Sequence, residues 1–411
     1  MDFGSLLLYV VSYFSLFTAI FFFLTLLENR NKLGNPKCSR FLSVTVAVPA
    51  YNEEKTLAKT VSSLLSLDYP KDKLDIIVID DGSTDNTYNI ARDIKAENLR
   101  VFTKKKEGKA AALNFALKKC KTELFGALDA DSFVVSDALK NMMGYFEDER
   151  IVAVTPSLKI YKPKTALQKI QRIEYLMGIF LRKIFAFLGS IHVTPGPFTI
   201  YRKSFFDKYG GYDDKNMTED IEVALRIQSN KMVIENSADA IVYTIGPKTF
   251  RALLKQRTRW YLGFMENVIN YKHLFSYKYG NLGLFILPAS FISVALVVIT
   301  LIYTIFKTVS DSIQNLINYN AINFELSQLL KFDFDLFYIN VGSLMYLSAL
   351  TLLFGVLMIY FAKKISKENI PIRLHYVFYL IIYWFLFGFW WIVASIYKLL
   401  GKRIEWGQRT L

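Results

Sequence analysis

Four long apolar stretches, which lie toward the two ends of the chain, constrain its fold more than any other feature. Residues 4–27 carry no charged side chain and are rich in Leu, Phe and Val. About 20 apolar residues span a bilayer, so this stretch is long enough to cross one. Three more candidates follow the polar middle of the chain, at residues 282–306, 337–361 and 375–399. A buried core helix could explain one such segment, but four around one polar block predict a membrane protein.

The polar block between these stretches predicts the domain organisation. We expect residues 1–28 to form a membrane helix, residues 29–279 a soluble domain, and residues 280–411 a membrane region with about three spans. The first stretch differs from a cleaved signal peptide, because its apolar run is too long and no basic leader or small-residue cleavage site accompanies it. The chain is therefore expected to be a multi-pass protein of the cell membrane.

Basic residues predict the orientation of the soluble domain. The net charge is +14, and Lys and Arg cluster where apolar runs meet the polar block, as at Arg30, Lys272 and Lys363. The positive-inside rule then places this domain in the cytosol. We find no nucleic-acid-binding motif and expect no nucleic-acid partner, since anionic lipid headgroups explain the basic residues more simply. Counting spans puts the C-terminus outside, whereas Lys398 and Lys402 favour the inside, and the sequence leaves this conflict open.

Apolar runs and helical patterns alternate in the polar block. Strands are expected at residues 43–48, 75–79, 99–103 and 124–128, and helices at 53–67, 84–96, 108–120 and 136–146. Ser83 or Thr84 is the expected N-cap of the second helix. Such alternation predicts a parallel sheet covered by helices on both faces. Two longer helices, near residues 166–191 and 249–272, suit the membrane interface, although the first has the pattern of an ordinary core helix as well.

Pairs of carboxylates follow two of the predicted strands, at the point where each strand ends. Asp80 and Asp81 follow one apolar run, and Asp129 and Asp131 follow another. The carboxyl ends of parallel strands border the crevice in which open α/β sheets bind ligands. Two carboxylates around a small residue can share a Mg²⁺ or Mn²⁺ ion with a diphosphate. Taken alone, the first pair could also be a helix cap with a turn, and a D-x-D triplet such as the second is common by chance.

Three further motifs add polar groups that suit a transfer reaction. Thr218-Glu219-Asp220 opens a predicted helix, where a carboxylate could be a general base or simply complement the helix dipole. A Q-x-x-R-W motif at residues 256–260 places an amide, a cation and an indole on one helix. Arg can neutralise a diphosphate and Trp can stack on a sugar, but a Trp-anchored basic face near lipid would look the same. The turn at residues 49–54 could wrap a nucleobase or cap a helix.

Taken together, the motifs D-D, D-x-D, T-E-D and Q-x-x-R-W make the chain resemble the processive family 2 glycosyltransferases over nearly its whole length. These are the bacterial poly-N-acetylglucosamine, hyaluronan, chitin-oligomer and cellulose synthases, and the chain is most similar to the first type. Residues 108–114, 195–202 and 247–253 also look like family segments, and residues 406–410 look like the tail of several members. Where that tail is cytosolic, the span count above is wrong by one. The resemblance implies a GT-A fold, which is a Rossmann-like α/β domain with a mostly parallel sheet, joined to transmembrane helices.

The resemblance also implies roles for single residues. Asp220 would be the catalytic base, and Asp131 would ligate Mg²⁺ or Mn²⁺ together with Asp129. The implied nucleotide-binding residues are Pro49, Tyr51, Glu53, Asp81, Lys109 and Asp129, of which Asp81 would contact the uracil. The implied residues for the acceptor and the diphosphate are Gly196, Glu219, Gln256, Arg259 and Trp260. Gly196 would lie close to the acceptor sugar, where a side chain would intrude.

The implied function is that of a membrane-bound inverting glycosyltransferase. It would move a hexose unit, expected to be N-acetylglucosamine, from a UDP-sugar to a growing β-linked polysaccharide and couple this to export. The expected partners are a UDP-sugar, a glycan acceptor and the lipid bilayer. One alternative is a transferase that adds a single sugar to a lipid or lipid-linked acceptor. Another is a transporter or scaffold with a dead transferase domain, which would require the loss of an acid that every motif here keeps.

Overall fold

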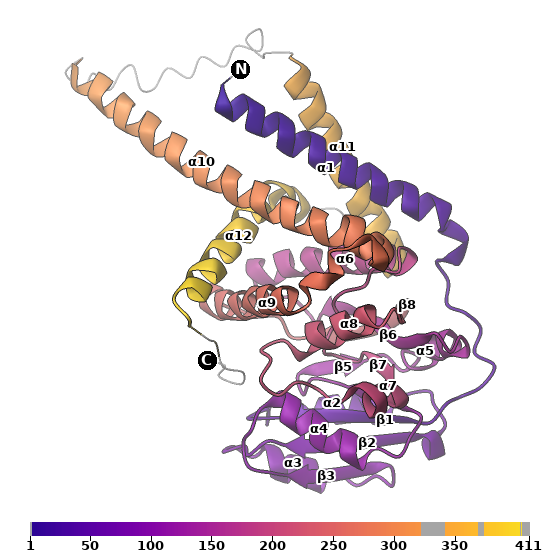
Figure 1. The fold of residues 1–411 in the computed structure, drawn as a ribbon. Helices are drawn as coiled ribbons and strands as arrows, with labels where there is room; N and C mark the ends of the chain where they lie inside the picture. The colour runs from indigo at the N-terminus through magenta and orange to yellow at the C-terminus, as the bar shows by residue number, and fades with distance from the viewer. Residues whose placement is uncertain (1, 322–341, 369–373, 403, 405–411) are drawn as a thin grey trace.

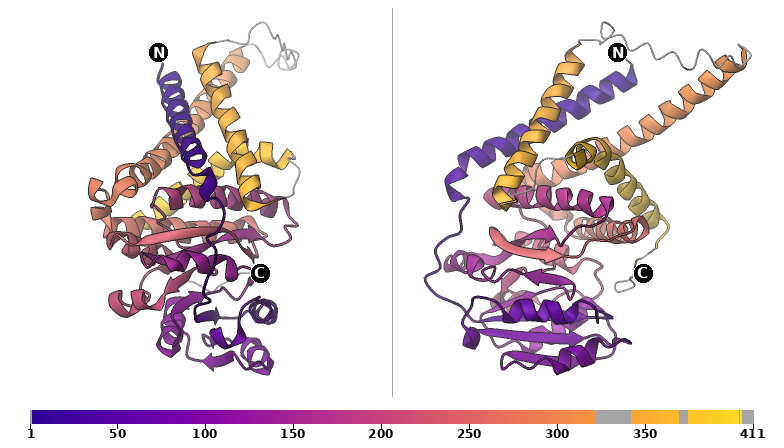
Figure 2. Two further views of the ribbon diagram at one scale, coloured as in Figure 1. Left: turned by 90° about the vertical axis from the view of Figure 1, so that its right-hand side faces the viewer. Right: turned by 180° about the vertical axis from the view of Figure 1, so that it is seen from behind.

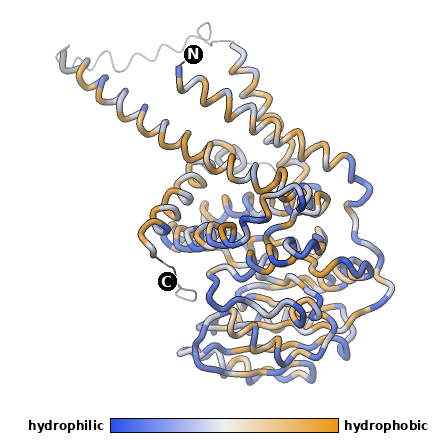
Figure 3. The backbone as a smooth tube through the Cα atoms, in the orientation of Figure 1, coloured by the Kyte–Doolittle hydropathy of each residue, from blue (hydrophilic) through white to orange (hydrophobic). Residues whose placement is uncertain are grey.

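The computed structural model describes residues 2–321, 342–368, 374–402 and 404, which form two stacked regions (Figure 1). An α/β domain forms the lower region in this view, and long helices rise from its upper side. Views from the side and from behind show the same stacking (Figure 2). Hydrophobic residues dominate the upper helices, whereas the lower region alternates between hydrophobic and hydrophilic segments (Figure 3). The predicted union of an α/β domain with an apolar helical region is therefore confirmed.

A mixed sheet runs through the α/β domain. Its strands in the described residues are β1 (Val44–Ala50), β2 (Leu74–Asp80), β3 (Leu99–Thr103), β4 (Leu124–Ala127), β5 (Ser132–Val134), β6 (Ile151–Ile160), β7 (Ile200–Arg202) and β8 (Val233–Thr244). They lie in the order β3-β2-β1-β4-β7-β6-β8-β5. The first four strands of this order are parallel, as are β6 and β8, whereas β7 and β5 run antiparallel to their neighbours. Because β2, β1 and β4 are parallel, the segments that follow them meet at one edge of the sheet.

Helices cover both faces of this sheet. They are α2 (Leu57–Leu65), α3 (Thr87–Asp93), α4 (Lys109–Lys119), α5 (Lys140–Met143), α7 (Lys203–Tyr209) and α8 (Glu219–Ser229). Successive side chains of a strand point to opposite faces. Accordingly, Val46 and Val48 of β1 pack into one core cluster with α2, α3 and α5, whereas Ala47 packs into another with α4, α7 and α8. The predicted two-sided cover is confirmed.

Two long helices, α6 (Ala166–Phe187) and α9 (Phe250–Asn270), lie between the sheet and the upper helices (Figure 1). Helix α6 begins at a capping box, in which Thr165 and Gln168 satisfy each other's backbone N–H groups. A third apolar cluster joins α6 to residues of the upper helices, among them Phe22, Leu282 and Ile359. The expected helices at the membrane side of the domain are thus present, and their contact with lipid stays a prediction.

Four helices among the described residues are long and apolar enough to cross a membrane. They are α1 (Phe3–Glu28), Leu282–Ile317, α11 (Ser343–Ser366) and Ile382–Leu399. The second joins a π-helical turn to α10 (Leu287–Ala321), and the fourth is part of α12 (Leu374–Leu399). Each predicted apolar segment thus overlaps such a helix, although α11 begins and ends later than the predicted stretch 337–361, and residues 337–341 lie outside the described residues. Helix α10 continues past residue 306, where the second predicted apolar stretch ends, to Ala321.

Both ends of α12 contact the α/β domain. Near its start, Tyr376 lines a small cavity together with Arg172 of α6. In its last turn, the Nζ atom of Lys398 lies 3.2 Å from the Oε1 atom of Glu266 on α9. Helix α12 therefore runs along the domain, whereas α1, α10 and α11 lead away from it (Figure 2). The family-like tail at residues 406–410 lies outside the described residues.

Two predicted helix starts are wrong by several residues. Helix α2 begins at Leu57 instead of residue 53, and α3 begins after Asn86 instead of Ser83 or Thr84. The reason is that the loops before these helices bond to each other. Asn52 donates its N–H to Ser83 and accepts a hydrogen bond from the N–H of Thr84. Such contacts between segments cannot be read from the pattern of either segment alone. The helix expected at 136–146 is also shorter, since only α5 and a following 3₁₀ turn form there.

Candidate functional site

Asp81 stands at the end of β2, where it holds a loop in place. Its buried carboxylate accepts hydrogen bonds from Lys104 Nζ at 3.0 Å and from the backbone N–H groups of Glu107 and Gly108 at 3.1 and 2.8 Å. Gly108 has a φ of +102°, which suits glycine, and it directly precedes α4. A carboxylate accepts about four hydrogen bonds, but the Asp81 side chain is 0% exposed, so the imide of a base could reach it only if the loop moved. The predicted uracil contact of Asp81 would therefore share its carboxylate with the loop.

The residues that follow β1 lie beside the same loop. The Nζ atom of Lys106 is 4.0 Å from the centroid of the Tyr51 ring. The Oε2 atom of Glu53 accepts a hydrogen bond from Thr56 Oγ1 at 2.8 Å, close to the start of α2. Pro49 is buried within β1. The structure thus places Tyr51 beside the loop that Asp81 holds. Glu53 contacts a residue of its own segment, and Pro49 lies in the core below them.

Lys109, the first residue of α4, is the centre of a charged cluster. Its Nζ atom lies 2.7 Å from Asp129 Oδ1 and 3.0 Å from Glu219 Oε1. Burial alone would lower the pKa of this ammonium, but the carboxylates of Asp129, Glu219 and Asp220 outweigh burial and raise the pKa above its usual value. Lys109 is therefore a permanent cation that joins the D-x-D segment to the T-E-D segment.

Asp220 lies beside this cluster, in the first turn of α8. Its backbone carbonyl accepts a hydrogen bond from Thr194 Oγ1 at 2.7 Å. Burial and the charge of Glu219 raise the pKa of this carboxyl to about 6, although Lys109 and Arg259 oppose the rise. A carboxylate with a pKa near 6 is suited to take a proton at neutral pH.

Gly196 approaches the same cluster closely. A Cβ atom on this glycine would lie 2.7 Å from Lys109 Nζ and 3.8 Å from each carboxylate oxygen of Asp129. Lys109 forms ion pairs with two carboxylates, so moving its ammonium to make room for a side chain would break at least one of these pairs. The sequence placed Gly196 where a side chain would intrude, and in the structure the group intruded upon is Lys109.

Asp129 and Asp131 are the candidate ligands for a divalent ion. Asp129 is held by Lys109, and Asp131 Oδ1 accepts a hydrogen bond from Ser132 Oγ at 3.2 Å. In residues 2–321, 342–368, 374–402 and 404, no three or more His, Cys, Asp or Glu side chains are grouped to hold a metal. Two carboxylates leave most of an ion's coordination to other oxygens, as Mg²⁺ and Mn²⁺ accept when a diphosphate accompanies them. The donor set therefore fits an ion that arrives with its nucleotide.

The three predicted residues of α9 lie in different surroundings. Arg259 Nη1 donates to the backbone carbonyl of Met217 at 3.1 Å, which places this cation on the T-E-D side. Trp260 lies beneath the guanidinium of Arg257, whose Cζ atom is 4.1 Å from the ring centroid, so one face of the indole is covered. Gln256 Oε1 is buried and accepts no hydrogen bond from any residue that the structure describes. Of these three residues, Arg259 is the one that belongs to the cluster around Lys109, because its positive charge lowers the pKa of Asp220.

An ion pair between α6 and α9 escaped the sequence reasoning. The Nη2 atom of Arg257 lies 2.8 Å from Glu174 Oε2, and the Arg257 side chain is only 2% exposed. Burial alone would lower the pKa of this guanidinium, but Glu174 outweighs burial and the pKa is raised. Glu174 is the single acid of α6, whose other charged residues are basic, and this was the signal available in the sequence. The sequence could not say which cation is its partner.

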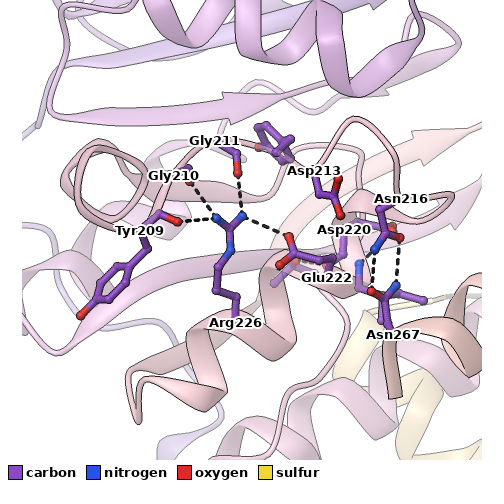
Figure 4. Close-up of polar contacts among 12 residues, drawn as sticks. Tyr209, Gly210, Gly211, Asp213, Asn216, Asp220, Glu222, Arg226 and Asn267 are labelled. Atoms are coloured by element: carbon purple, nitrogen blue, oxygen red, sulfur yellow. Dashed lines mark hydrogen bonds and ion pairs between the residues drawn. The ribbon is translucent and has the colours of Figure 1, made fainter. Parts of the chain in front are cut away.

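The sequence reasoning also missed a set of polar contacts around the segment that leads into Asp220. We call this segment, residues 210–218, the strap. Figure 4 shows how its two halves are held. At the first half, Arg226 of α8 donates to the carbonyls of Gly210 and Gly211 at 2.9 and 2.8 Å. At the second half, the side-chain amides of Asn216 and Asn267 face each other. The strap thereby ties α8 to α9.

Known proteins resemble this chain in sequence. The profile of the family described as Glycosyl transferase family 2 matches residues 45–210, which include the strand-end carboxylates and Gly196. Poly-beta-1,6-N-acetyl-D-glucosamine synthase of Staphylococcus epidermidis, strain RP62A, is 31% identical over 318 residues, or 76% of each chain. The synthase of the same name from Staphylococcus aureus, strain COL, is 33% identical over 276 residues, or 65% of this chain and 66% of that protein.

A solved structure resembles the chain in its fold. It is a mannosyltransferase from Pyrobaculum calidifontis in complex with GDP-Man and Mn²⁺. The two structures superpose with a TM-score of 0.55 at 18% sequence identity, over 96% of this chain and 100% of the other. At this level of identity the likeness bears on the fold alone, and it extends through the helices above the sheet as well as the α/β domain.

Proposed function

The chain belongs to family 2 of the glycosyltransferases, and from this premise we propose that it adds N-acetylglucosamine from a UDP-sugar to the end of a growing β-linked polysaccharide. The two staphylococcal synthases, named for such a polymer, support the choice of sugar and product. The observation that carries the proposal is the buried cluster in which Lys109 bridges Asp129 and Glu219 beside Asp220. It sets a base candidate next to cationic groups at the carboxyl edge of the sheet, where such folds bind ligands.

We propose that the reaction is a direct displacement. The oxygen of an acceptor hydroxyl forms a bond with the anomeric carbon, while the bond from that carbon to the diphosphate oxygen breaks. Asp220 takes the hydroxyl proton, and UDP leaves with the bonding electron pair. One carboxylate suffices, because no covalent intermediate is formed and the anomeric configuration inverts. Lys109 and Arg259 place positive charge near the departing diphosphate, whose negative charge grows as the bond breaks.

Asp129 and Asp131 would hold a Mg²⁺ or Mn²⁺ ion in this proposal. When bound, such an ion would neutralise charge on the diphosphate. Because Lys109 contacts Asp129, the ammonium lies on the same side of the sheet as the expected diphosphate. Asp81 and Tyr51, at the neighbouring strand ends, would take the base of the nucleotide.

The acceptor would bind on the α9 side of the cluster. Gln256 carries a buried oxygen that receives no hydrogen bond from the described part of the chain. An unsatisfied acceptor of this kind costs about 1–3 kcal/mol unless a ligand or water supplies the hydrogen. A glycan hydroxyl is such a donor. Trp260 still has one ring face that Arg257 does not cover, and a sugar ring could stack there. Glu219 and Gly196, which both border Lys109, would complete this side of the site.

We propose that α1, α10 and α11 cross the membrane and that α12 lies at its cytosolic surface. Helix α12 contacts the α/β domain through Tyr376 and Lys398, near its two ends. Three crossings put both the catalytic domain and the C-terminus in the cytosol if the N-terminus is outside. This arrangement removes the conflict between the span count and the basic residues that follow α12.

Membranes that contain the protein would be incubated with radiolabelled UDP-sugars, one at a time, and the products separated by size. We expect UDP-N-acetylglucosamine to yield long polymer and the other UDP-sugars to yield little. Membranes with the Asp220→Asn variant serve as the control for other transferases. Products that carry one added sugar would favour the single-addition alternative. A protein that transfers sugar from no UDP-sugar would contradict the proposal.

A further inference from the structure

Three residues of α9 form one stripe that faces the strap. Arg259, Gly263 and Asn267 are spaced four residues apart, and such residues lie on the same face of a helix. Each of them contacts the end of the strap, directly before α8. Arg259 donates to the carbonyl of Met217 at 3.1 Å, and the other two residues contact Thr218. The stripe therefore lies against the backbone that carries Asp220.

Asn267 makes the most extensive contact of the stripe. Its side chain is fully buried, and Nδ2 lies 3.0 Å from Thr218 Oγ1, 3.4 Å from the Thr218 carbonyl and 3.1 Å from Asn216 Oδ1. In return, Asn216 Nδ2 donates to Asn267 Oδ1 at 2.7 Å. The Oδ1 atom of Asn216 also accepts the N–H of Thr218 at 3.0 Å. A single amide of α9 thus holds the N-cap of α8, two residues before Asp220.

Gly263 sets how closely the two helices approach. A Cβ atom there would overlap the hydroxyl oxygen of Thr218 and would lie 2.5 Å from its Cγ2 atom and 2.8 Å from its Cβ atom. Glycine is unfavourable inside a helix, so its presence at this contact fits a need for space. The α8–α9 contact at Thr218 is therefore tight on one side and hydrogen-bonded on the other.

We propose that Asn267 is a positioning residue of the sugar transfer, which acts through Thr218 to fix the carboxylate of Asp220 relative to the cluster around Lys109. This inference rests on the proposed function, in which Asp220 is the base. A general base must stay within hydrogen-bond reach of the proton that it takes. An error of about 1 Å in placement can cost on the order of 100-fold in rate.

Helix α9 connects α12 with the segment that carries Asp220. On another face of α9, the rings of Tyr261 and Trp391 of α12 are stacked with centroids 4.6 Å apart. Helix α9 is thus held by α12 on one face and holds the strap with another. If α9 shifted relative to the sheet, these contacts would carry the strap with it and change the position of Asp220 relative to Lys109.

The first test compares Asn267→Ala with Asn236→Ala. Asn236 is equally buried, and its Nδ2 atom also faces three oxygens, of Thr155 and Pro156, but it joins β8 to β6. We expect both variants to lower the melting temperature. Only Asn267→Ala should lower kcat, by about 10- to 100-fold, with KM for the UDP-sugar and the affinity for UDP unchanged. Equal kcat losses in the two variants, or a wild-type kcat in Asn267→Ala, would overturn the inference.

The second test covers the case in which Asn267→Ala does not fold. Gly263→Ala adds one methyl group against Thr218, and Gly178→Ala adds the same group to α6, where nothing lies within 4 Å of the new Cβ atom. We expect kcat to fall in the first variant and to stay at the wild-type value in the second. An unchanged kcat in Gly263→Ala contradicts the inference. If the wild-type protein transfers sugar from no UDP-sugar, the proposed function fails. If the wild-type protein is active and Gly263→Ala keeps its kcat, only the present inference fails.

Discussion

At the scale of single residues, Lys109 supplies the positive charge that partly neutralises the carboxylates of the candidate site. Three carboxylates, of Asp129, Glu219 and Asp220, act on its ammonium, and their repulsion would be costly without a cation between them. The ammonium neutralises part of this charge, yet burial and Glu219 still leave Asp220 with a raised pKa. Of the three acids, Asp129 and Glu219 are paired with Lys109, and Asp220 is the one that we propose as the base.

Asp220→Asn is expected to abolish transfer and to keep UDP binding. The amide preserves the shape of the side chain but cannot take a proton, and loss of a general base typically costs about 10² to 10⁴ in rate. Transfer is measured with the radiolabelled UDP-sugar, and UDP affinity is measured by calorimetry. Near-normal turnover in the Asn variant would show that the base lies elsewhere.

The pH dependence of the wild-type protein provides a control for this assignment. Asp220 must be deprotonated to act as a base, and its pKa is raised to about 6. We therefore expect kcat/KM to fall as the pH drops below about 6, by about tenfold per pH unit well below the pKa. Residual activity of Asp220→Asn should lack this acid limb. An identical limb in both proteins would assign it to another group.

Asp131→Ala is expected to raise the metal concentration needed for activity and to weaken UDP binding. Removal of one carboxylate leaves Asp129, which also contacts Lys109, as the sole acid of the D-x-D segment for the ion. The measurement is activity over a titration of Mg²⁺ or Mn²⁺. Asp68→Ala, which removes an exposed acid, is the matched control. Full activity of the wild-type protein in EDTA would contradict the metal assignment.

At the scale of elements, α6 and α9 depend on each other through a buried ion pair. Removal of one partner leaves a charge in the interior without compensation, which costs about 3–5 kcal/mol. Glu174→Ala is therefore expected to lower the unfolding free energy by this amount, because Arg257 is only 2% exposed. The measurement is thermal unfolding in detergent. Replacing Arg257 by Met in the same chain should recover part of the loss.

An exposed pair of similar geometry serves as the control for Glu174→Ala. Asp207 pairs with Lys203 on α7, and its side chain is 59% exposed. Exposed pairs contribute about 0–1 kcal/mol, so Asp207→Ala should change the melting temperature little. If Glu174→Ala were as mild as this control, the ion pair would not hold α6 to α9.

The sequence predicted elements better than it predicted the contacts between them. Strand ends, helix faces and the acids that follow the strands were predictable because hydrophobic periodicity and motif order are local. The true starts of α2 and α3 were not, since Asn52 bonds to Ser83 and Thr84 from another part of the chain. The same holds for Asn267 and Glu174, whose partners lie far away in sequence. The candidate site was predicted as a set of residues, and the structure adds which of them meet.

At the scale of the whole molecule, the two ends of α12 bear on membrane topology. Because both ends contact the α/β domain, we expect a reporter fused to the C-terminus to lie in the cytosol. A reporter inserted between α10 and α11 should lie outside. The measurement uses one reporter that is active only in the cytosol and another that is active only outside it. A C-terminal reporter found outside would show that α12 crosses the membrane.

The apolar cluster shared by α6 and the upper helices has a practical consequence for work with this protein. Phe22, Leu282 and Ile359 cover part of the apolar face of α6. A chain cut to residues 29–279 would leave that face bare, and large bare apolar patches drive aggregation. Such a fragment should collect in inclusion bodies, whereas the full chain should be recoverable in mild detergent. For crystallisation or inhibitor screening, the smallest workable unit is therefore the catalytic domain together with the helices that cover it.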